Sequence, residues 1–431
     1  MPDQAAPLTI AGGFIVDPGT GYCGPGDLFL AGGRVVGIGA PGEHGAVGRV
    51  LDAAGRVVSP GLIDLHVHLR EPGQSHKETI ATGTQAAVAG GFTAVCCMPN
   101  TTPVLDRPER LRELAVRVAE DAVCRVYPIG AACLDNDPER PADLGALANC
   151  GCLAATDDAF PLQTQDQRRD ALLRAAAAGL PFVAHCEDKR LSADGVINEG
   201  AISRELGVPG QPDRAESEAV AAWLELADCG ARLHLAHIST AASVAAIARA
   251  CAMWGDRLTA ETAPHYFALS ERAVLEHGAN AKMNPPLRTD ADRQQVLQAL
   301  AEGLIPVIAS DHAPHAAEEK GRGLLEAPFG VVGLETSLGA SLTALPMAVS
   351  DVLGRLSTAP ARAFGLPGGH LAPGALADVT VFDPDEEWTV EPSVFLSKGR
   401  NTPFAGARLK GRAWATVVAG RLVWHDGQLL Q

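Results

Sequence analysis

The sequence lacks a basic tract, and acidic residues outnumber basic ones along it. Its 431 residues include 35 Lys and Arg against 51 Asp and Glu, which gives a formal net charge of −16 at pH 7. A surface of this sign repels phosphate groups, so neither a nucleic acid nor an anionic membrane is an expected partner. Any anionic ligand would have to be held by a few local cationic groups.

The sequence also lacks three other features: a leader-like beginning, an apolar run long enough to span a membrane, and a CxxC pair. No basic segment followed by an apolar one is visible near residue 1, and the longest alanine-rich run, residues 170–180, contains Arg174 and is too short to span a bilayer. The ten cysteines are scattered, which argues against a zinc ribbon and against a disulfide framework. We therefore expect a cytoplasmic globular protein with reduced thiols.

The two ends of the sequence share a residue pattern that is typical of β-hairpins and that the middle does not have. Hydrophobic residues make up 47% of the whole, enough for a large packed core. From Leu8 to Val58, and again from about Ala375 onward, short β-type stretches alternate with Gly and Pro turns. This pattern predicts one small β domain assembled from both termini.

Between the two ends, eight short apolar runs alternate with longer helical patterns. The runs begin at Gly61, Thr93, Arg125, Cys152, Pro181, Arg232, Leu258 and Ile305. Apolar strands that each precede a helix are typical of a parallel sheet covered on both faces, so the middle is predicted to form an α/β fold, a TIM-like (β/α)8 barrel. We predict that residues 59–366 form the barrel and that residues 1–58 and 367–431 form the β domain.

The strongest sign of chemistry is the segment DLHVH, residues 64–68, within the first apolar run. Side chains two positions apart in a strand point to the same side, so His66 and His68 are expected to face the barrel mouth together. Two imidazoles beside the carboxylate of Asp64 suit a borderline metal ion such as zinc. The alternative is a pair of hydrogen-bonded structural histidines.

Further histidines and a carboxylate lie near the ends of later runs. His185 lies in PFVAHCED, His237 in RLHLAHIST and Asp311 in IPVIASDHAPH. Four imidazoles that converge at one rim would repel one another if protonated, and a shared metal ion explains their coexistence better. Taken singly, each of these histidines could instead be a hydrogen-bonded core residue.

The end of the fourth run bears on how two metal ions could be bridged. Barrel hydrolases with this arrangement often use a carbamylated lysine, but none of the six lysines of this chain lies there. Asp157 and Asp158 do lie there, in LAATDDAF, and we favour Asp158 as the bridging carboxylate. The alternative for this pair is a helix cap or a solvated turn.

Six motifs together resemble one enzyme family. The segments DLHVHLREPG, GGFTAVCCMPNT, AHCED, KMNPPLR, ASDHAPH and APFGVVGLET look like those of dihydroorotases, of the bacterial type with a longer chain, within the amidohydrolase superfamily. The similarity extends from Gly61 to Pro403. It implies a distorted (β/α)8 barrel with a small β-sandwich, and the reversible hydrolysis of dihydroorotate to N-carbamoyl-aspartate in pyrimidine biosynthesis.

The resemblance also implies two zinc ions per subunit, bridged by Asp158 and a hydroxide. One ion would be held by His66, His68, Asp158 and Asp311, and the other by Asp158, His185 and His237. The ions would activate the hydroxide, and Asp311 would take its proton and pass it to the departing ring nitrogen. Because every ligand position is filled, a non-catalytic scaffold that binds aspartate transcarbamoylase is disfavoured.

The carboxylate of dihydroorotate needs a local cation in so negative a protein. Arg70, two positions after His68, is expected to point inward and to bind it with a planar fork; the alternative is an exposed ion pair with Glu71. The resemblance adds substrate contacts from His68, Asn100, Asn284, His315 and the backbone around Phe329 and Gly330. The alternative for the two asparagines is that they stabilise a turn or cap a helix. Residues 316–327 are predicted to form a mobile loop that could cover the pocket.

The nearest rival is another cyclic-amide hydrolase, such as a hydantoinase or an allantoinase. These enzymes share the barrel and the HxH motif, but they normally use a bridging lysine and lack the HLREPG and KMNPPLR segments. A homodimer and an association with aspartate transcarbamoylase both stay open, because nothing in the sequence identifies a docking surface.

Overall fold

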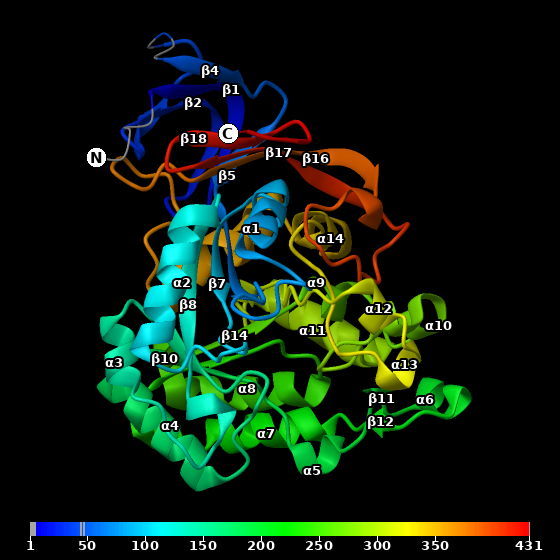
Figure 1. Cartoon of the computed structure of the whole chain (residues 1–431). Coiled ribbons are helices and arrows are strands. Elements are labelled where there is room, and N and C mark those ends of the chain that lie inside the picture. Colours follow the sequence, from blue (N-terminus) through cyan, green and yellow to red (C-terminus); the bar gives the residue numbers. More distant parts are fainter. Residues whose placement is uncertain (1–5, 44, 46–47, 431) are drawn as a thin grey trace.

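The computed structural model describes residues 6–43, 45 and 48–430. Figure 1 shows two parts: a sheet that both chain ends build, drawn in blue and in orange to red, and a barrel with its helices, built from the middle of the chain. The prediction of a TIM-like barrel joined to a β domain made from both termini is therefore confirmed.

Eight parallel strands form the barrel, and each predicted apolar run overlaps one of them. Their spatial order is β15-β14-β13-β10-β9-β8-β7-β6. Their bounds are Leu62–Val67 (β6), Phe92–Cys97 (β7), Arg125–Ala131 (β8), Ala154–Thr156 (β9), Pro181–Ala184 (β10), Arg232–Leu235 (β13), Leu258–Thr262 (β14) and Val307–Ile308 (β15). An isolated parallel bridge between Val67 and His312 brings the two edges of this sheet together.

Helices follow the strands and surround the barrel. The longer ones are α1 (Ile80–Ala89), α2 (Pro108–Asp121), α3 (Leu144–Asn149), α4 (Gln165–Ala177), α6 (Ala201–Leu206), α7 (Arg214–Leu224), α8 (Ala241–Trp254), α11 (Asp290–Glu302), α14 (Ser337–Ala344) and α16 (Ala359–Phe364). Shorter elements are α5 (Lys189–Ser192), α9 (Pro264–Ala268), α10 (Ala273–His277), α12 (Ala317–Lys320), α13 (Gly323–Glu326), α15 (Val349–Leu353), the π-helical turn Gly354–Thr358 and the two-residue strands β11 (Ile197–Asn198) and β12 (Gly210–Gln211). Within the described ranges, every helix is too short or too polar to serve as a transmembrane span.

Local sequence explains where several of these helices begin. Thr79, Thr164, Thr240 and Thr289 precede α1, α4, α8 and α11, and each side chain accepts a hydrogen bond from a backbone N–H of the first turn. A threonine cap of this kind stabilises a helix by about 1 kcal/mol relative to alanine. At the other end, Gly303 has φ +80° and ends α11, a conformation that favours glycine.

The strands are packed with apolar side chains. One cluster joins strands to helices, as where the rings of Phe182 in β10 and Trp223 in α7 lie 5.0 Å apart. A separate cluster includes Ile63, Val183 and Phe364. Strands packed in this way form a rigid support for the side chains at their carboxyl ends.

Nine strands from the two chain ends form the second sheet. Their bounds are Leu8–Asp17 (β1), Tyr22–Ala31 (β2), Arg34–Gly39 (β3), Arg49–Asp52 (β4), Val57–Pro60 (β5), Val379–Thr389 (β16), Arg408–Val418 (β17), Arg421–His425 (β18) and Gln428–Leu429 (β19). The order is β19-β18-β17-β16-β5-β1-β2-β3, with β4 paired to β1. The antiparallel pair β16–β5 joins the two ends, and strands from both contribute to one hydrophobic cluster.

Between β16 and β17 the chain leaves this sheet and lies against the barrel. Ser397 donates to Glu78 over 2.5 Å, and the backbone N–H of His315 donates to Asn401 Oδ1 over 3.1 Å. The boundaries at residues 58 and 366 stay a prediction, but residues on the C-terminal side of the second boundary contact loops of the barrel.

Candidate active site

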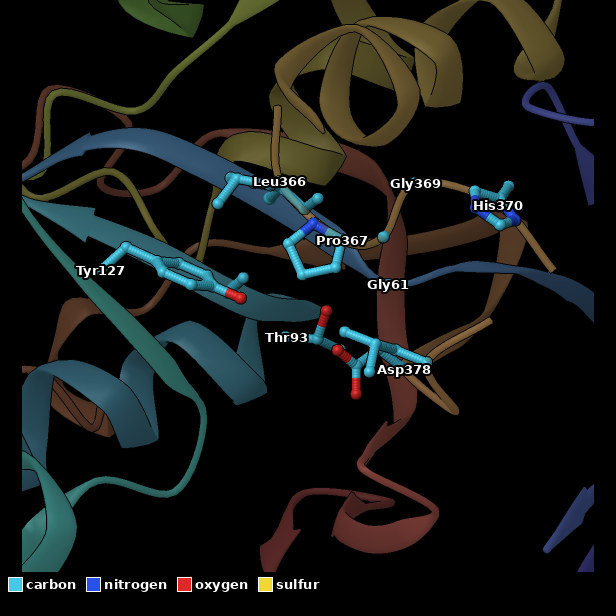
Figure 2. Close-up of a pocket in the computed structure, with 12 residues that line it drawn as sticks. Gly61, Thr93, Tyr127, Leu366, Pro367, Gly369, His370 and Asp378 are labelled. Atoms are coloured by element: carbon cyan, nitrogen blue, oxygen red, sulfur yellow. The ribbon is translucent and has the colours of Figure 1, made fainter. Parts of the chain in front are cut away.

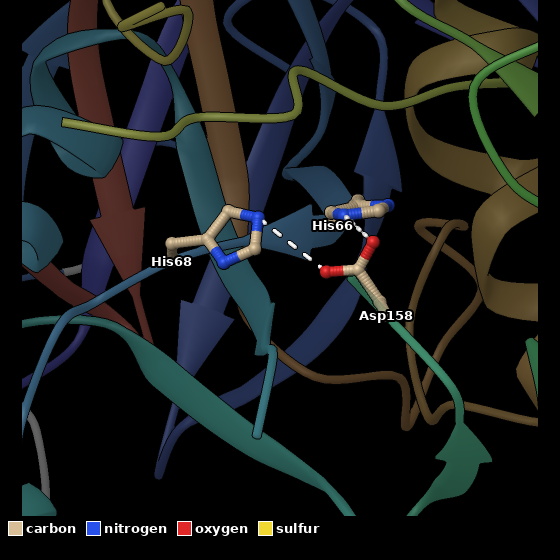
Figure 3. A group of neighbouring side chains, drawn as sticks. All are labelled: His66, His68 and Asp158. Carbon is tan, nitrogen blue, oxygen red and sulfur yellow. Dashed lines mark ion pairs between the residues drawn. The ribbon is translucent and has the colours of Figure 1, made fainter. Parts of the chain in front are cut away.

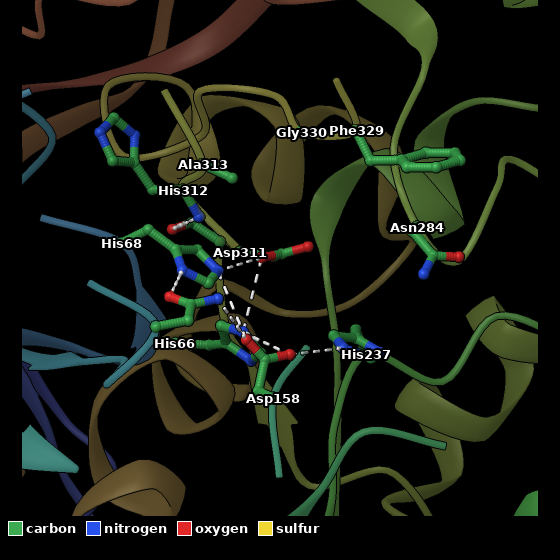
Figure 4. Close-up of polar contacts among 12 residues, drawn as sticks. His66, His68, Asp158, His237, Asn284, Asp311, His312, Ala313, Phe329 and Gly330 are labelled. Atoms are coloured by element: carbon green, nitrogen blue, oxygen red, sulfur yellow. Dashed lines mark hydrogen bonds and ion pairs between the residues drawn. The ribbon is translucent and has the colours of Figure 1, made fainter. Parts of the chain in front are cut away.

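The predicted site residues lie together at the carboxyl ends of the barrel strands. His66 is in β6, and the others follow strands: His68, Asp158, His185, His237 and Asp311. Figure 4 shows His66, His68, Asp158, His237 and Asp311 around one centre. Parallel barrels gather their chemistry at this end, because each strand delivers a side chain into a shared mouth.

His66, His68 and Asp158 form a first group whose ligand atoms all lie within 4.8 Å of one another. His66 Nε2 lies 3.8 Å from Asp158 Oδ1, and His68 Nε2 lies 3.8 Å from Asp158 Oδ2 (Figure 3). Asp311 Oδ1 adds a fourth possible ligand atom, 3.5 Å from His66 Nε2 and 3.4 Å from His68 Nε2. The four predicted ligands of the first ion are therefore brought together.

Asp158, His185 and His237 form a second group, whose ligand atoms also lie within 4.8 Å of one another. His185 Nδ1 lies 3.1 Å from Asp158 Oδ1 and 2.9 Å from His237 Nε2. His237 Nε2 lies 3.7 Å from Asp158 Oδ1. Asp158 thus faces both groups, the position that a bridging carboxylate needs.

The donor set and its spacing fit divalent metal ions. Two ligands about 2.0–2.1 Å from a tetrahedral zinc ion are roughly 3.4 Å apart, close to the separations in both groups. His66 Nε2 is buried and has no hydrogen-bond partner in the described part of the chain, although it points at two carboxylates. Such an atom is costly to bury unless it binds something. The two groups can therefore hold metal ions.

Three of the candidate histidine ligands have an oxygen within hydrogen-bond distance of the ring nitrogen that points away from the centre. His66 Nδ1 lies 2.8 Å from Glu261 Oε1, His68 Nδ1 lies 2.9 Å from Asn100 Oδ1, and His185 Nε2 lies 2.9 Å from Glu187 Oε2. A proton on the rear nitrogen leaves the lone pair of the front nitrogen directed at the centre. The arrangement fixes the tautomer and orientation that a metal ligand requires.

Burial and the neighbouring polar groups shift the pKa values of these residues in opposite directions. Burial lowers the pKa of His185, but hydrogen bonds to Asp158 and Glu187 outweigh it and raise that pKa to about 9. Burial raises the pKa of Asp158, but hydrogen bonds to His185 and His237 hold it well below its ordinary value. Asp158 therefore stays ionised, and protons compete with metal ions for the imidazoles as the pH falls.

The neighbouring carboxylates Asp64 and Asp157 have structural duties. Asp64 accepts hydrogen bonds from the backbone N–H groups of His66, over 3.0 Å, and Ser310, over 3.1 Å, and burial raises its pKa to about 7. Asp157 accepts from the backbone N–H groups of His185 and Leu162, each over 2.9 Å. Asp157 takes the turn role, whereas Asp158 faces the imidazoles, which supports the choice of Asp158 as ligand.

Three site residues have a left-handed backbone. The φ angles of Arg70, His237 and Asp311 are +63°, +37° and +47°. A side chain with a Cβ adopts this region at a cost of about 1–3 kcal/mol, which the surrounding packing must offset. Strain of this kind clusters where the backbone must aim a functional side chain away from its strand.

Arg70 is a buried cation, 8% exposed. Its Nε donates to Pro314 O over 3.1 Å, and its Nη2 lies 3.3 Å from His315 Nε2. Burial lowers its pKa to about 10, so the guanidinium stays charged at neutral pH. Glu71 accepts from the backbone N–H of Ile80 over 2.9 Å, and the alternative of an Arg70–Glu71 ion pair is not formed. Among the described residues, no carboxylate lies within ion-pair distance of Arg70, which leaves it available to an anion.

Comparison with known proteins agrees with this geometry. A family model described as Dihydro-orotase-like matches residues 55–243. The dihydroorotase of Pelotomaculum thermopropionicum is 47% identical over 424 residues, 97% of this chain and 99% of that protein. The dihydroorotase of Syntrophotalea carbinolica is 44% identical over 422 residues, again 97% and 99%. The chain belongs to the dihydroorotase family.

Solved structures establish the fold alone. The L-hydantoinase of Arthrobacter aurescens superimposes with a TM-score of 0.88 at 24% identity, covering 98% of this chain and 97% of that one. The dihydropyrimidinase of Brevibacillus agri gives 0.85 at 24% identity, with 98% and 96% covered. The barrel-and-sheet architecture is therefore shared beyond the dihydroorotase family.

Within this dihydroorotase-family site, the two predicted asparagines lie beside the two groups of candidate ligands. Besides contacting His68, Asn100 directs its Nδ2 at Asp158 Oδ2, 3.4 Å away. Asn284 Nδ2 donates to Glu187 Oε2 over 2.8 Å. Both amides contact ligands or the residues that hold them, so their contact with a substrate stays a prediction.

The predicted substrate segment around Phe329 contacts His315, which is a neighbour of Arg70. His315 Nε2 lies 2.8 Å from Phe329 O, which implies a donated hydrogen bond. The backbone N–H of Gly330 donates to Lys282 O over 3.0 Å. The structure thus brings His315, Phe329 and Gly330 together, but it uses the N–H of Gly330 within the protein.

Two carboxylates of the site were not assigned from the sequence. The sequence could have indicated Glu187, because it lies two positions after His185 in the AHCED motif. The indication for Glu261 was weaker: it is an acidic residue within the apolar run LTAETAPHYF, where burial without a partner is unfavourable. Burial raises the pKa of Glu261, but its interactions with His234 and His66 outweigh burial and lower that pKa to about 2.

Two cavities of the described structure differ in whether they could take a substrate. One, of about 10 Å³, lies at the amino ends of the strands near Gly61, Thr93 and Asp378, where the barrel meets the sheet (Figure 2). It has room for roughly one water molecule and cannot hold a substrate. The other, a groove of about 400 Å³, is lined by His315 and Lys320 and adjoins the surroundings of Arg70.

Proposed function

We propose that this protein is a dihydroorotase that hydrolyses the cyclic amide of dihydroorotate reversibly to N-carbamoyl-aspartate, a reaction of pyrimidine biosynthesis. The observation that carries the proposal is the buried guanidinium of Arg70, which has no carboxylate partner among the described residues and lies near two groups of candidate His and Asp ligands. Identities of 47% and 44% to dihydroorotases over nearly the whole chain support it.

The proposal includes two zinc ions per subunit, shared through Asp158, and a cytoplasmic location. Imidazole and carboxylate donors are those that zinc prefers. When bound between these groups, such ions lower the pKa of a water molecule and polarise the amide carbonyl. A homodimer and association with aspartate transcarbamoylase stay predictions from the resemblance.

Asp311 is proposed as the proton carrier. Burial raises its pKa, but His66 and His68 outweigh burial and hold the pKa well below its ordinary value, so the group is a carboxylate at neutral pH. It can take a proton from the attacking water and deliver it to the ring nitrogen as the amide bond breaks. Run in reverse, the same transfers close the ring.

Arg70 supplies the anchor for the carboxylate of the substrate. Its planar fork suits bidentate binding, and the charge is held in a site that excludes most water. The protein as a whole is strongly acidic, so this local cation decides where an anionic substrate can bind.

The direct test combines turnover and metal content on one sample. We expect the purified protein to convert dihydroorotate and N-carbamoyl-aspartate into one another, measured by chromatography, and to contain two zinc ions per chain by mass spectrometry. Removal of the ions with a chelator should abolish turnover, and zinc should restore it. Turnover of hydantoin or allantoin about tenfold faster than that of dihydroorotate would contradict the proposal.

Replacing Arg70 with lysine should raise KM for dihydroorotate roughly 10- to 100-fold. A charge-assisted hydrogen bond contributes about 1.5–3 kcal/mol, and a lysine cannot reproduce a bidentate pair. Zinc content should not change, because Arg70 is not among the candidate ligands. Steady-state kinetics with metal analysis checks this, with Arg117→Lys as control, since the Arg117 side chain is 49% exposed. Loss of zinc in Arg70→Lys would assign Arg70 a structural role instead.

A further inference from the structure

Lys320 is a buried lysine in the segment predicted as a mobile loop. Residues 316–327 contain the short helices α12 and α13, and Lys320, at the end of α12, is 6% exposed. Burial and the nearby charge of Lys282 lower its pKa to about 7. No carboxylate in the described part of the chain forms an ion pair with it. Burying an unpaired ammonium is unfavourable, so its surroundings must compensate in another way.

Three backbone carbonyls provide that compensation. Lys320 Nζ donates to Lys282 O over 3.2 Å, to Pro328 O over 3.0 Å and to Gly330 O over 3.0 Å. An ammonium has three N–H groups, so all of its donors are used. Lys320 therefore has no hydrogen left to offer to a substrate, and its role lies in what it holds.

The three carbonyls belong to the two segments predicted to contact the substrate. Lys282 lies two positions before Asn284, and Pro328 and Gly330 flank Phe329. The two segments also meet directly, because the N–H of Gly330 donates to Lys282 O. One ammonium thus holds both segments at the point where they meet.

Gly330 is the most constrained of these positions. Its φ is +139°, and a Cβ there would come within 2.7 Å of Ala313 O and 3.0 Å of His315 Nε2. Its carbonyl also accepts from Asn401 Nδ2 over 2.9 Å, and Asn401 Oδ1 accepts the N–H of His315. A shift of Gly330 would therefore be transmitted to His315, which contacts Arg70.

We propose that Lys320 is a positioning residue of the substrate pocket, which orders the segments around Asn284 and Phe329–Gly330 without touching the substrate. The inference rests on the proposed dihydroorotase function. Lys320 Nζ donates its three hydrogen bonds to the three backbone carbonyls and none to the candidate ligands around Asp158 and Asp311, so its loss should weaken substrate binding and leave the metal groups intact. Binding that is equal in the ground state and transition state affects KM rather than kcat.

The test compares Lys320→Met and Lys320→Gln with the wild-type chain and with Lys410→Met, a change at an exposed lysine of β17. Methionine removes all three donors, and glutamine retains two. We expect KM for dihydroorotate to rise roughly 10- to 100-fold in Lys320→Met and less in Lys320→Gln, with kcat within about threefold and zinc content unchanged. Lys410→Met should match the wild type.

The outcomes separate this inference from the function on which it rests. If the wild type and Lys410→Met turn over dihydroorotate and the Lys320 variants keep the wild-type KM, only the role of Lys320 is wrong. A parallel loss of kcat and zinc in Lys320→Met, or failure of both Lys320 variants to fold by circular dichroism, would make the lysine structural and overturn the inference. Absence of turnover in the wild type would overturn the proposed function itself.

Discussion

Replacing Asp158 with alanine is expected to lower kcat for dihydroorotate by more than about 10³-fold and to release bound zinc. Asp158 is the residue that the two candidate metal groups share, with one carboxylate oxygen toward His66 and His185 and the other toward His68. Its removal takes a candidate ligand from both groups and removes the carboxylate that faces all four buried imidazoles. Turnover and zinc content, measured on the same sample, check this expectation.

Asp157→Asn is the matched control for that experiment. Asp157 is the adjacent acid, but its oxygens accept hydrogen bonds from backbone N–H groups, a role that an asparagine partly retains. This variant should keep its zinc and most of its activity. Retention of both zinc ions by Asp158→Ala would show that the carboxylate does not bridge them, and zinc loss from Asp157→Asn alone would exchange the roles of the two residues.

The sequence predicted which histidines and aspartates meet at the barrel rim, because their positions follow local rules. His66 and His68 are two positions apart at a strand end, where the backbone presents both imidazoles to one centre. The other candidate ligands follow buried strands, and a parallel barrel brings such positions to one rim. These inferences need only the order of strands and the face on which a side chain lies.

The residues that hold the ligands were harder to predict, because their partners are distant in sequence. His66 and Glu261 are 195 positions apart, and their contact depends on how β6 and β14 are placed across the barrel. The contact of Asn100 with the substrate stays a prediction, and the structure adds that its side chain contacts His68 and points at Asp158. A sequence motif identifies such an asparagine but does not indicate which neighbouring side chains it contacts.

Lys320 shows why local composition can mislead. It lies in the segment EEKGRG, and the charged run to which it belongs has the composition of a solvated loop. In the structure, carbonyls from two other segments converge on its ammonium, so the lysine is buried. Convergence of backbone groups leaves no trace in residue types, and only the folded chain reveals it.

Replacing Asp311 with asparagine should lower kcat by roughly 10²- to 10⁴-fold with the fold retained. Asparagine has the same shape but cannot accept the proton of the attacking water. His66, His68 and Asp158 remain to hold an ion, so zinc content should fall little. Kinetics, metal analysis and circular dichroism check the three parts of this expectation.

Glu318→Gln is the control for Asp311→Asn, since it removes an exposed negative charge from the loop that follows the same strand. It should leave kcat unchanged, which would separate loss of the proton carrier from a general change in local charge. If Asp311→Asn keeps its zinc and turns over dihydroorotate within about tenfold of the wild type, another group must move the proton. If it loses zinc together with activity, Asp311 acts first as a ligand, because the remaining donors cannot then hold the ion without its carboxylate.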